Sequence, residues 1–279
     1  MERMIRHIAV LLLAGVLLAA CGQTQGGAGQ GGQAGQSGSA TLRVGASPVP
    51  HAEILKFVRD NLAEREGLDI QIVEFTDYVQ PNLALNDGQI DANFFQHVPY
   101  MEDFGKQRGI SMVAVARVHI EPLGVYSRKI TALADVPQDA VVAIPNDATN
   151  AGRALQLLAA NNLLTLKPEV GAAATLNDIT ANPKNLQLKE LEAAQLPRSL
   201  DDTTLSVING NYALEVGLKP SQDALALEKG EGNPYANVLT ALQTRADDPN
   251  IQKLARLLES SEVRRFIQDT YQGVVIPAS

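Results

Sequence analysis

The stretch that decides the fold runs from residue 41 to residue 75 and reads TLRVGASPVPHAEILKFVRDNLAEREGLDIQIVEF. Residues 41–45 predict a short strand, and two prolines mark the turn that follows it. Residues 52–66 predict a helix, because apolar residues recur there at helical spacing until Gly67 ends the pattern. Residues 68–72 alternate apolar and polar side chains, which predicts a second strand. A strand, a helix and a strand in this order indicate an α/β fold.

The same alternation continues along the rest of the chain, which has 279 residues. We expect further strands at residues 89–93, 112–117, 140–144, 186–190, 205–209 and 238–244, and further helices at residues 79–86, 98–108, 150–162, 195–200, 251–260 and 262–271. The pattern restarts after Ser127, which predicts two α/β lobes with a cleft between them. The first predicted lobe comprises residues 41–127 and 233–279, and the second comprises residues 128–232, so the chain should cross between lobes near Ser127 and Asn233.

The N-terminal segment has the pattern of an export signal. A positively charged start is followed by an apolar run that is too short to span a bilayer. The four residues LAAC that end at Cys21 resemble the lipobox of bacterial lipoproteins, in which the signal is removed before the cysteine and acyl chains are attached to it. Residues 1–20 are therefore the predicted signal peptide, and residues 21–40, rich in Gly and Gln, are the predicted lipidated tether. We expect a lipid anchor on the extracytoplasmic face of a bacterial cell membrane.

Composition argues against several classes of protein. The chain has 23 Lys and Arg against 31 Asp and Glu, and an acidic chain without a basic block is not expected to bind nucleic acid. One cysteine allows neither an internal disulfide nor a cysteine-based zinc or iron–sulfur site. The sequence contains no G-x-S-x-G, no G-x-x-x-x-G-K-[ST] and no H-E-x-x-H motif. We therefore expect neither an enzyme nor a cofactor, and a surface hydrolase is the weakest alternative.

A metal site is a second alternative. His97, His119 and Glu121 supply two imidazoles and a carboxylate, a donor set that suits zinc. The ordinary interpretation of each histidine is a hydrogen-bonded residue of the cleft or the surface. A metal-binding lipoprotein that uses His97 and His119 therefore stays open at this point.

Three groups of motifs stand out within the predicted body: FTDYVQPN (75–82) with GQIDANFFQHVPY (88–100), then PNDATNAGRAL (145–155), and finally NPKNL (182–186), ELEAAQLPRSLDD (190–202) and VIN (207–209). With these motifs, the chain from about Leu42 to its C-terminus resembles the NlpA-type methionine-binding lipoproteins, the substrate-binding components of methionine ABC importers. The resemblance implies a two-lobed, type II periplasmic-binding-protein fold that closes on methionine or a related amino acid. It also implies delivery to a permease driven by an ATPase, and we expect a monomer.

A free amino acid presents a carboxylate and an ammonium, and the chain offers partners for both. Arg153 lies just inside a predicted helix that Thr149 or Asn150 can cap, where a guanidinium and helix N–H groups favour a carboxylate. Asn209 ends an apolar strand and can accept from the ammonium, as can Glu121. Asn150 either caps the helix, contacts the ligand or does both.

Aromatic residues gather in the first predicted lobe. Tyr78, Phe95, His97 and Tyr100 are expected to wall the ligand, and a thioether suits such a wall. Core packing is the main interpretation of Phe94. His119 and Glu121 lie two residues apart in an extended segment, so both should point the same way, and we count both as binding residues. Because some members of the family carry apolar or tyrosyl residues here, a methionyl dipeptide stays open as an alternative ligand.

Overall fold

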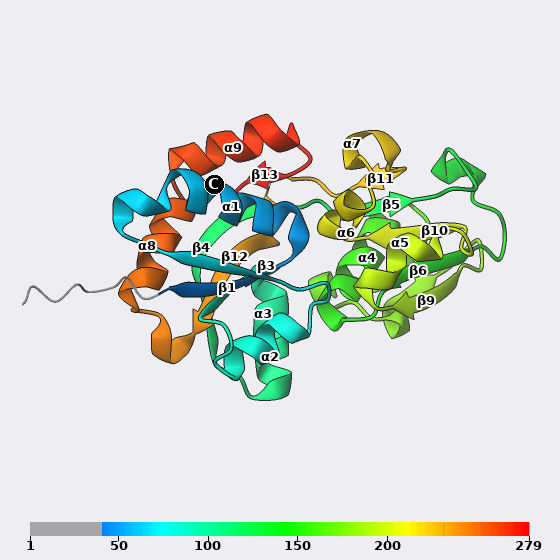
Figure 1. Ribbon diagram of the computed structural model, residues 1–279. Coiled ribbons are helices and arrows are strands. Elements are labelled where there is room, and N and C mark those ends of the chain that lie inside the picture. Colours follow the sequence, from blue (N-terminus) through cyan, green and yellow to red (C-terminus); the bar gives the residue numbers. More distant parts are fainter. Residues whose placement is uncertain (1–40, 231, 279) are drawn as a thin grey trace, which may run out of the picture. The chain divides into compact units, whose positions relative to one another are not determined.

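The computed structural model describes residues 41–230 and 232–278, and two separate sheets organise them (Figure 1). The predicted signal peptide, the tether and Cys21 lie outside the described residues. Strands and helices alternate along the chain, so the expected α/β fold is confirmed. None of the helices in the described residues has the length and apolar character that crossing a bilayer requires.

The first sheet has six strands, in the order β13 (Ile276–Pro277), β4 (Met112–Ile120), β12 (Ala236–Leu242), β3 (Ala92–His97), β1 (Leu42–Ala46) and β2 (Ile70–Glu74). β1 pairs in parallel with β2 and β3, whereas β12 pairs antiparallel with β3 and β4. Its helices are α1 (Glu53–Asn61), α2 (Gln80–Asn86), α3 (Val98–Arg108), α8 (Pro249–Leu258) and α9 (Ser261–Tyr271). We call residues 41–120 and 236–278 the first lobe.

The second sheet has five strands, in the order β11 (Ala226–Leu227), β5 (Gly124–Tyr126), β10 (Leu205–Ile208), β6 (Val141–Pro145) and β9 (Gln187–Leu191). Its helices are α4 (Ala148–Ala160), α5 (Leu196–Ser199), α6 (Gly210–Glu215) and α7 (Pro220–Asp223), and a separate pair of strands, β7 (Thr165–Leu166) and β8 (Ile179–Ala181), accompanies them. We call residues 124–227 the second lobe. Each lobe has a buried apolar core of its own.

The chain crosses between the lobes in two segments, residues 121–123 and residues 228–235. The sequence predicts the first crossing near Ser127, but the crossing lies a few residues earlier. Gly124–Tyr126 already pairs antiparallel with β10 in the second sheet. Asn233 lies within the second crossing segment. The boundaries given by the sheets therefore differ by a few residues from those predicted.

Two elements, α1 and β3, have bounds that differ from those predicted from the sequence, and each difference has a local cause. The predicted helix 52–66 is the α-helix α1 only as far as Asn61; it continues as the 3-10 turn η2 (Ala63–Glu66), which Gly67 ends at φ 59°. β3 lies at 92–97 and not at 89–93; it is an interior strand between β12 and β1, and all six of its residues are buried. A strand covered on both faces shows no alternation of apolar and polar residues.

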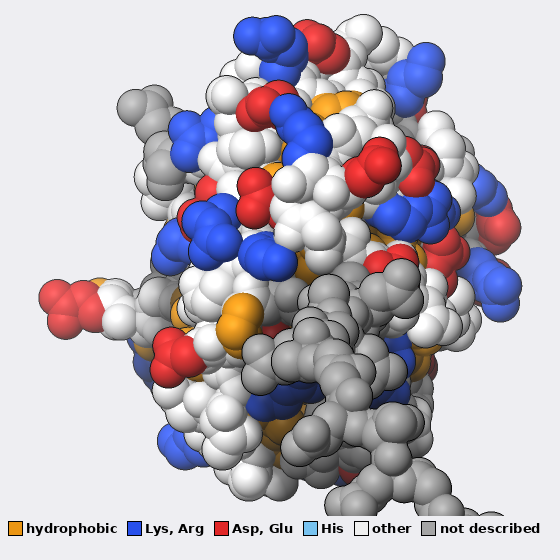
Figure 2. Space-filling model, turned by 60° about the vertical axis from the view of Figure 1, so that its left-hand side comes forward, with side chains coloured by type: hydrophobic (Ala, Val, Ile, Leu, Met, Phe, Trp, Pro, Cys, Tyr) orange, Lys and Arg blue, Asp and Glu red, His pale blue; other side chains and the backbone are white. Residues whose placement is uncertain are grey.

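One face of the molecule carries a mixture of charges. In Figure 2, Lys and Arg side chains lie interspersed with Asp and Glu side chains outside the grey atoms. Interspersed charges of opposite sign offset each other, so the part of this face outside the grey atoms presents no extended field of one sign.

Helix α4 packs tightly through a glycine, and this gives a prediction about stability. A Cβ on Gly152 would collide with the backbone carbonyl oxygen of Ala172, which cannot swing away as a side chain can. Replacing an internal helix glycine by alanine normally stabilises a helix by up to about 1 kcal/mol. Gly152→Ala should instead lower the free energy of unfolding by about 1–3 kcal/mol, as overpacking does. Urea unfolding followed by circular dichroism measures it, and a stabilised variant would contradict this packing.

Candidate functional site

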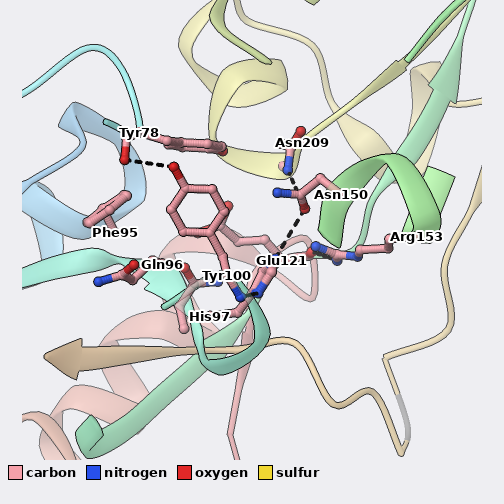
Figure 3. Close-up of a pocket in the computed structure, with 11 residues that line it drawn as sticks. Tyr78, Phe95, Gln96, His97, Tyr100, Glu121, Asn150, Arg153 and Asn209 are labelled. Atoms are coloured by element: carbon pink, nitrogen blue, oxygen red, sulfur yellow. Dashed lines mark hydrogen bonds between the residues drawn. The ribbon is translucent and has the colours of Figure 1, made fainter. Parts of the chain in front are cut away.

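A small cavity lies between the lobes. Its walls comprise Tyr78, Phe95, Gln96, His97, Tyr100 and Asn237 from the first lobe, Asn150, Arg153, Asn209 and Gly210 from the second lobe, and Glu121 from the first crossing segment (Figure 3). Eight of the nine predicted binding residues therefore line one cavity; His119 does not. His97 ends β3 and Asn209 follows β10, so the carboxyl ends of strands from both sheets meet here.

Arg153 projects from α4 toward the cavity and is only 4% exposed (Figure 3). Its Nε and Nη2 donate to the two carboxylate oxygens of Glu228, at 2.7 and 2.5 Å, and Nη2 also donates to the backbone oxygen of Glu121 at 2.7 Å. The guanidinium carbon lies 4.3 Å from the ring centre of Tyr235. Glu228 thus already makes the two-pronged contact expected of a ligand carboxylate. The two N–H groups on Nη1 of Arg153 are not used in these contacts and can donate to an anion in the cavity.

The start of α4 is capped by Asp147 and not by Thr149 or Asn150. Asp147 Oδ1 accepts from the backbone N–H of Asn150 at 2.9 Å and from the Thr149 hydroxyl at 3.0 Å. Burial raises the pKa of Asp147, whereas its hydrogen bonds with Asn150 and Thr149 favour the ionised form. The predicted cap was wrong because the helix begins two residues earlier than its apolar pattern indicated.

Asn150 connects the two lobes through its side chain. Its Oδ1 lies 3.1 Å from His97 Nε2 in the first lobe and 3.1 Å from Asn209 Nδ2 in the second (Figure 3). His97 Nδ1 accepts from the backbone N–H of Tyr100 at 3.2 Å, which assigns the ring proton to Nε2. Burial, together with the nearby Arg153 charge, lowers the pKa of His97 to about 3. His97 is therefore a neutral donor across the cleft.

Asn209 presents an unused acceptor. Its Nδ2 donates to Asn150, while its buried Oδ1 has no hydrogen-bond partner within the described residues. Leaving a buried acceptor unpaired costs about 1–3 kcal/mol. Because Asn209 lines the cavity, this oxygen can accept from a donor group of a ligand.

Aromatic rings form the side of the cavity that belongs to the first lobe. The ring centre of Tyr78 lies 5.8 Å from those of both Phe95 and Tyr100. The Tyr100 hydroxyl donates to the backbone oxygen of Tyr78 at 2.9 Å, which fixes the position of both rings. Phe94 points to the other face of β3 and is fully buried in the core of the first lobe, as expected.

Glu121 and His119 point the same way, as the spacing predicted. His119 Nε2 lies 2.7 Å from Glu121 Oε1, and His51 Nε2 lies 3.2 Å from the same oxygen. His119 is fully buried behind Glu121, so it does not form part of the cavity wall as we had expected. Burial raises the pKa of Glu121 and lowers the pKa values of His51 and His119, to about 4 and about 3.

The structure contradicts a metal site that combines His97 with His119. Both residues lie opposite Asn237, on the two strands that flank β12, so they are separated by two strand spacings, about 9–10 Å. Among the described residues, the one group of three His, Cys, Asp or Glu that could share an ion is His51, His119 and Glu121.

A larger hollow of about 480 Å3 adjoins the cavity, and the two share Tyr78 and Tyr100. Acidic side chains, Asp77, Asp147 and Glu192, line this hollow. The smaller cavity is the stronger binding candidate despite its size, because the unpartnered Oδ1 of Asn209 and the buried Arg153 belong to its wall.

Sequence reasoning missed five residues of the site and its support: Gln96, Gly210 and Asn237 on the cavity wall, and His51 and Glu228 behind it. Gln96 stands inside a motif already singled out, and Asn237 directly precedes the predicted strand 238–244. Polar side chains at positions 96 and 237, within a motif and next to a predicted strand, could have indicated that both residues belong to the site. His51 and Glu228 reach the site only through tertiary folding.

Comparisons with known proteins agree with one another. A profile of the NlpA lipoprotein family matches residues 42–279. The Probable D-methionine-binding lipoprotein MetQ of Vibrio cholerae is 40% identical over 83% of this chain and 86% of its own length. A nutrient-binding protein of Burkholderia cenocepacia, solved bound to methionine, is 43% identical with a TM-score of 0.82, over 85% of this chain and 100% of that one. An ABC transporter periplasmic substrate-binding protein of Coxiella burnetii is 40% identical with a TM-score of 0.81, at the same coverage.

The neutral, buried state of His97 predicts an acid sensitivity. Its pKa is about 3 when folded and about 6.5 when unfolded, so below pH 6.5 the unfolded chain binds a proton that the folded protein refuses. Stability is therefore lost as pH falls. His97→Gln keeps an Nε donor but does not titrate. Between pH 6 and pH 4, the stability of the native protein relative to this variant should fall by about 1.4 kcal/mol per pH unit. Urea unfolding at several pH values measures it, and a constant difference would show that His97 is not neutral and buried.

Proposed function

This chain belongs to the NlpA lipoprotein family, and on that basis we propose that it captures methionine, or a closely related amino acid, and delivers it unchanged to an ABC importer. The observation that carries the proposal is one cavity in which the Arg153 guanidinium, the acceptors Glu121 and Asn209 and an aromatic wall face one another. The relatives named as methionine-binding, and the structure solved with methionine, support it.

Each part of a zwitterionic amino acid has a partner of matching chemistry in this cavity. The Nη1 donors of Arg153 suit the carboxylate, and the open Oδ1 of Asn209 together with Glu121 suits the ammonium. The rings of Tyr78, Phe95 and Tyr100 suit a thioether, at roughly 0.3–1.5 kcal/mol for each sulfur–aromatic contact. This arrangement contains no activated nucleophile, so we propose binding without chemical change.

Contacts between the lobes support capture by closure. The Tyr78 hydroxyl of the first lobe donates to Asn211 Oδ1 of the second lobe at 2.5 Å, and the Tyr212 hydroxyl donates to the backbone oxygen of Thr76 at 3.1 Å. The rings of Tyr78 and Tyr212 lie 5.0 Å apart. These contacts close the cavity toward the larger hollow, and the exclusion of water strengthens the pairing of Arg153 with a carboxylate. Opening would require rotation about residues 121–123 and 228–235.

The remaining parts of the proposal concern location and partners. We propose that residues 1–20 direct export, that Cys21 is acylated, and that the body is held at the extracytoplasmic face of a bacterial membrane as a monomer. The partner would be a permease with its ATPase, as the naming of the Coxiella burnetii relative suggests. A methionyl dipeptide is the second candidate ligand, because the adjoining hollow of about 480 Å3 offers room for another residue.

Removing Arg153 should abolish most of the affinity for methionine. Arg153→Met keeps part of the apolar stem but removes the charge, and loss of one partner of a buried charge pair costs about 2–5 kcal/mol. We expect L-methionine binding, measured by isothermal titration calorimetry, to weaken at least 30-fold. Native mass spectrometry of the purified protein identifies any ligand retained from the cell and separates methionine from a dipeptide.

Arg153→Met also leaves the carboxylate of Glu228 buried without its partner, and a control must remove this second effect. The double variant Arg153→Met/Glu228→Gln has no such unpaired charge. If the double variant regains native affinity, Arg153 does not bind the carboxylate. If the native protein binds neither methionine, in its L or D form, nor a methionyl dipeptide, the proposed function is wrong.

Replacement of the predicted lipidation site should release the protein from the membrane. Cys21→Ser removes the thiol to which acyl chains would attach, so we expect the variant expressed in a bacterial host to lose radiolabelled palmitate and to move to the soluble fraction. The folded body, and hence methionine affinity, should be unchanged. Equal palmitate labelling of both proteins would contradict the assignment.

A further inference from the structure

A buried group of three ionisable side chains lies directly behind the cavity. It consists of His51 from the turn η1 (Pro48–Ala52), His119 from β4 and Glu121 from the first crossing segment. The two imidazoles are fully buried and Glu121 is 6% exposed. Only Glu121 of the three reaches the cavity wall. The proposed function uses Glu121 but gives the two histidines no part.

The hydrogen bonds fix where the imidazole protons lie. Both Nε2 atoms face acceptors: His119 Nε2 faces Glu121 Oε1 at 2.7 Å, and His51 Nε2 lies 3.2 Å from the same oxygen and 3.0 Å from Asn237 Oδ1. Both Nδ1 atoms are buried and have no partner within the described residues. A proton on Nδ1 would be buried without an acceptor, so each ring carries its proton on Nε2 and is neutral.

Neutral imidazole donors favour the ionised form of the buried Glu121 carboxylate. A buried carboxylate tends to take up a proton, and burial does raise the pKa of Glu121. A protonated Glu121 would be a donor and would offer no counter-charge to an ammonium. The His119 N–H on one carboxylate oxygen, a backbone N–H of Asn211, and the His51 N–H, which lies 3.2 Å from the same oxygen and is shared with Asn237, favour the ionised form. Unlike Lys or Arg, a neutral imidazole brings no positive charge that would cancel this negative charge.

The surroundings of the two rings leave little freedom for another arrangement. His51 and His119 each stand edge-on against Phe94, with ring centres 4.8 and 5.3 Å away. Two further charged groups act on Glu121: Arg153, which donates to the Glu121 backbone oxygen, and Glu215, whose pKa the charge of Glu121 helps to raise. The rings can therefore neither turn away nor exchange partners without disrupting the core of the first lobe.

We propose that His51 and His119 are positioning residues that keep Glu121 ionised and aimed at the cavity, so that the site selects ligands with a free ammonium group. The inference rests on the proposed function and names the recognised group: a protonated primary amine next to the carboxylate. An analogue without that amine brings no positive charge to the buried carboxylate of Glu121. Such an analogue should bind much more weakly than its amino acid.

A divalent ion among the same three residues is the competing interpretation, and the unpartnered Nδ1 atoms argue against it. An imidazole that binds a metal through Nε2 carries its proton on Nδ1 and nearly always donates it to an acceptor. Within the described residues, neither Nδ1 has one. Metal binding would therefore bury two unpaired donors.

The test compares variants that remove or retain the N–H donor. His51→Phe and His119→Phe keep an aromatic ring of similar size without a donor, whereas His51→Gln and His119→Gln place an amide N–H near the position of Nε2. Calorimetry is carried out with L-methionine and with 4-(methylthio)butanoate, which lacks the amine. The Phe variants should bind L-methionine at least tenfold more weakly, with little change for 4-(methylthio)butanoate. The Gln variants should keep most of the native preference.

Infrared difference spectroscopy gives a second measurement that does not depend on ligand affinity. The difference between native protein and Glu121→Gln at neutral pH should contain the band of a carboxylate, and in the background of either Phe variant it should contain the band of a protonated acid. A protonated Glu121 in the native protein would overturn the inference. So would an equal loss of affinity for both ligands in the Phe variants.

The remaining outcomes also separate the hypotheses. If the Phe variants do not fold, the native infrared difference and the Gln variants still decide whether Glu121 is ionised and whether the donors are sufficient. A chelator that lowers the thermal stability of the native protein would favour the ion and contradict the inference. If the native protein binds no methionine, the proposed function fails, while the infrared result still reports on the cluster.

Discussion

The contact on which the rest of the structure depends is the one that buries the Arg153 guanidinium. A buried cation is tolerated only with close partners, and Arg153 finds them in Glu228 and in the backbone oxygen of Glu121. Those partners belong to the two segments that cross between the lobes. Glu228 also accepts from the backbone N–H of Leu123 at 3.1 Å, so one carboxylate joins both crossings to α4. The cavity therefore lies beside both crossing segments, and in the proposed closure a ligand there would contact the residues that move.

Charge balance around the cavity follows from the same contact. Glu228 compensates Arg153, and neutral imidazoles support Glu121, so the protein leaves a donor edge at one end of the cavity and acceptors at the other. The distances between these groups are held by different elements: α4 carries Arg153, β10 leads to Asn209, and β4 leads to Glu121. A small zwitterion matches this distribution, whereas an ion of either sign alone would leave one end without a partner.

Much of the fold was readable from the sequence because its elements have local signals. The apolar face of α1, the αL glycines Gly67 and Gly109 and the caps Ser260 and Asp248 all act within a few residues. The site was partly readable because its motifs lie at strand ends. The partners of those residues were not, since Glu228 lies 75 positions from Arg153 and Asn237 lies 186 positions from His51. Such pairs are set by sheet order, which leaves no periodic signal in the sequence.

The two kinds of contact in the cavity should discriminate ligands with different strictness. Apolar and aromatic walls separate ligands that differ by one methylene by only about 1–3 kcal/mol, because a poorly filled apolar space leaves no polar group unpaired. The ends of the cavity behave differently: a ligand without its ammonium gives Glu121 no counter-charge, and a ligand without its carboxylate leaves the Nη1 donors of Arg153 unused. Under the proposed function, the ring cluster of Tyr78, Phe95 and Tyr100 would therefore set a preference among side chains, whereas the charged ends would set which class of molecule binds at all.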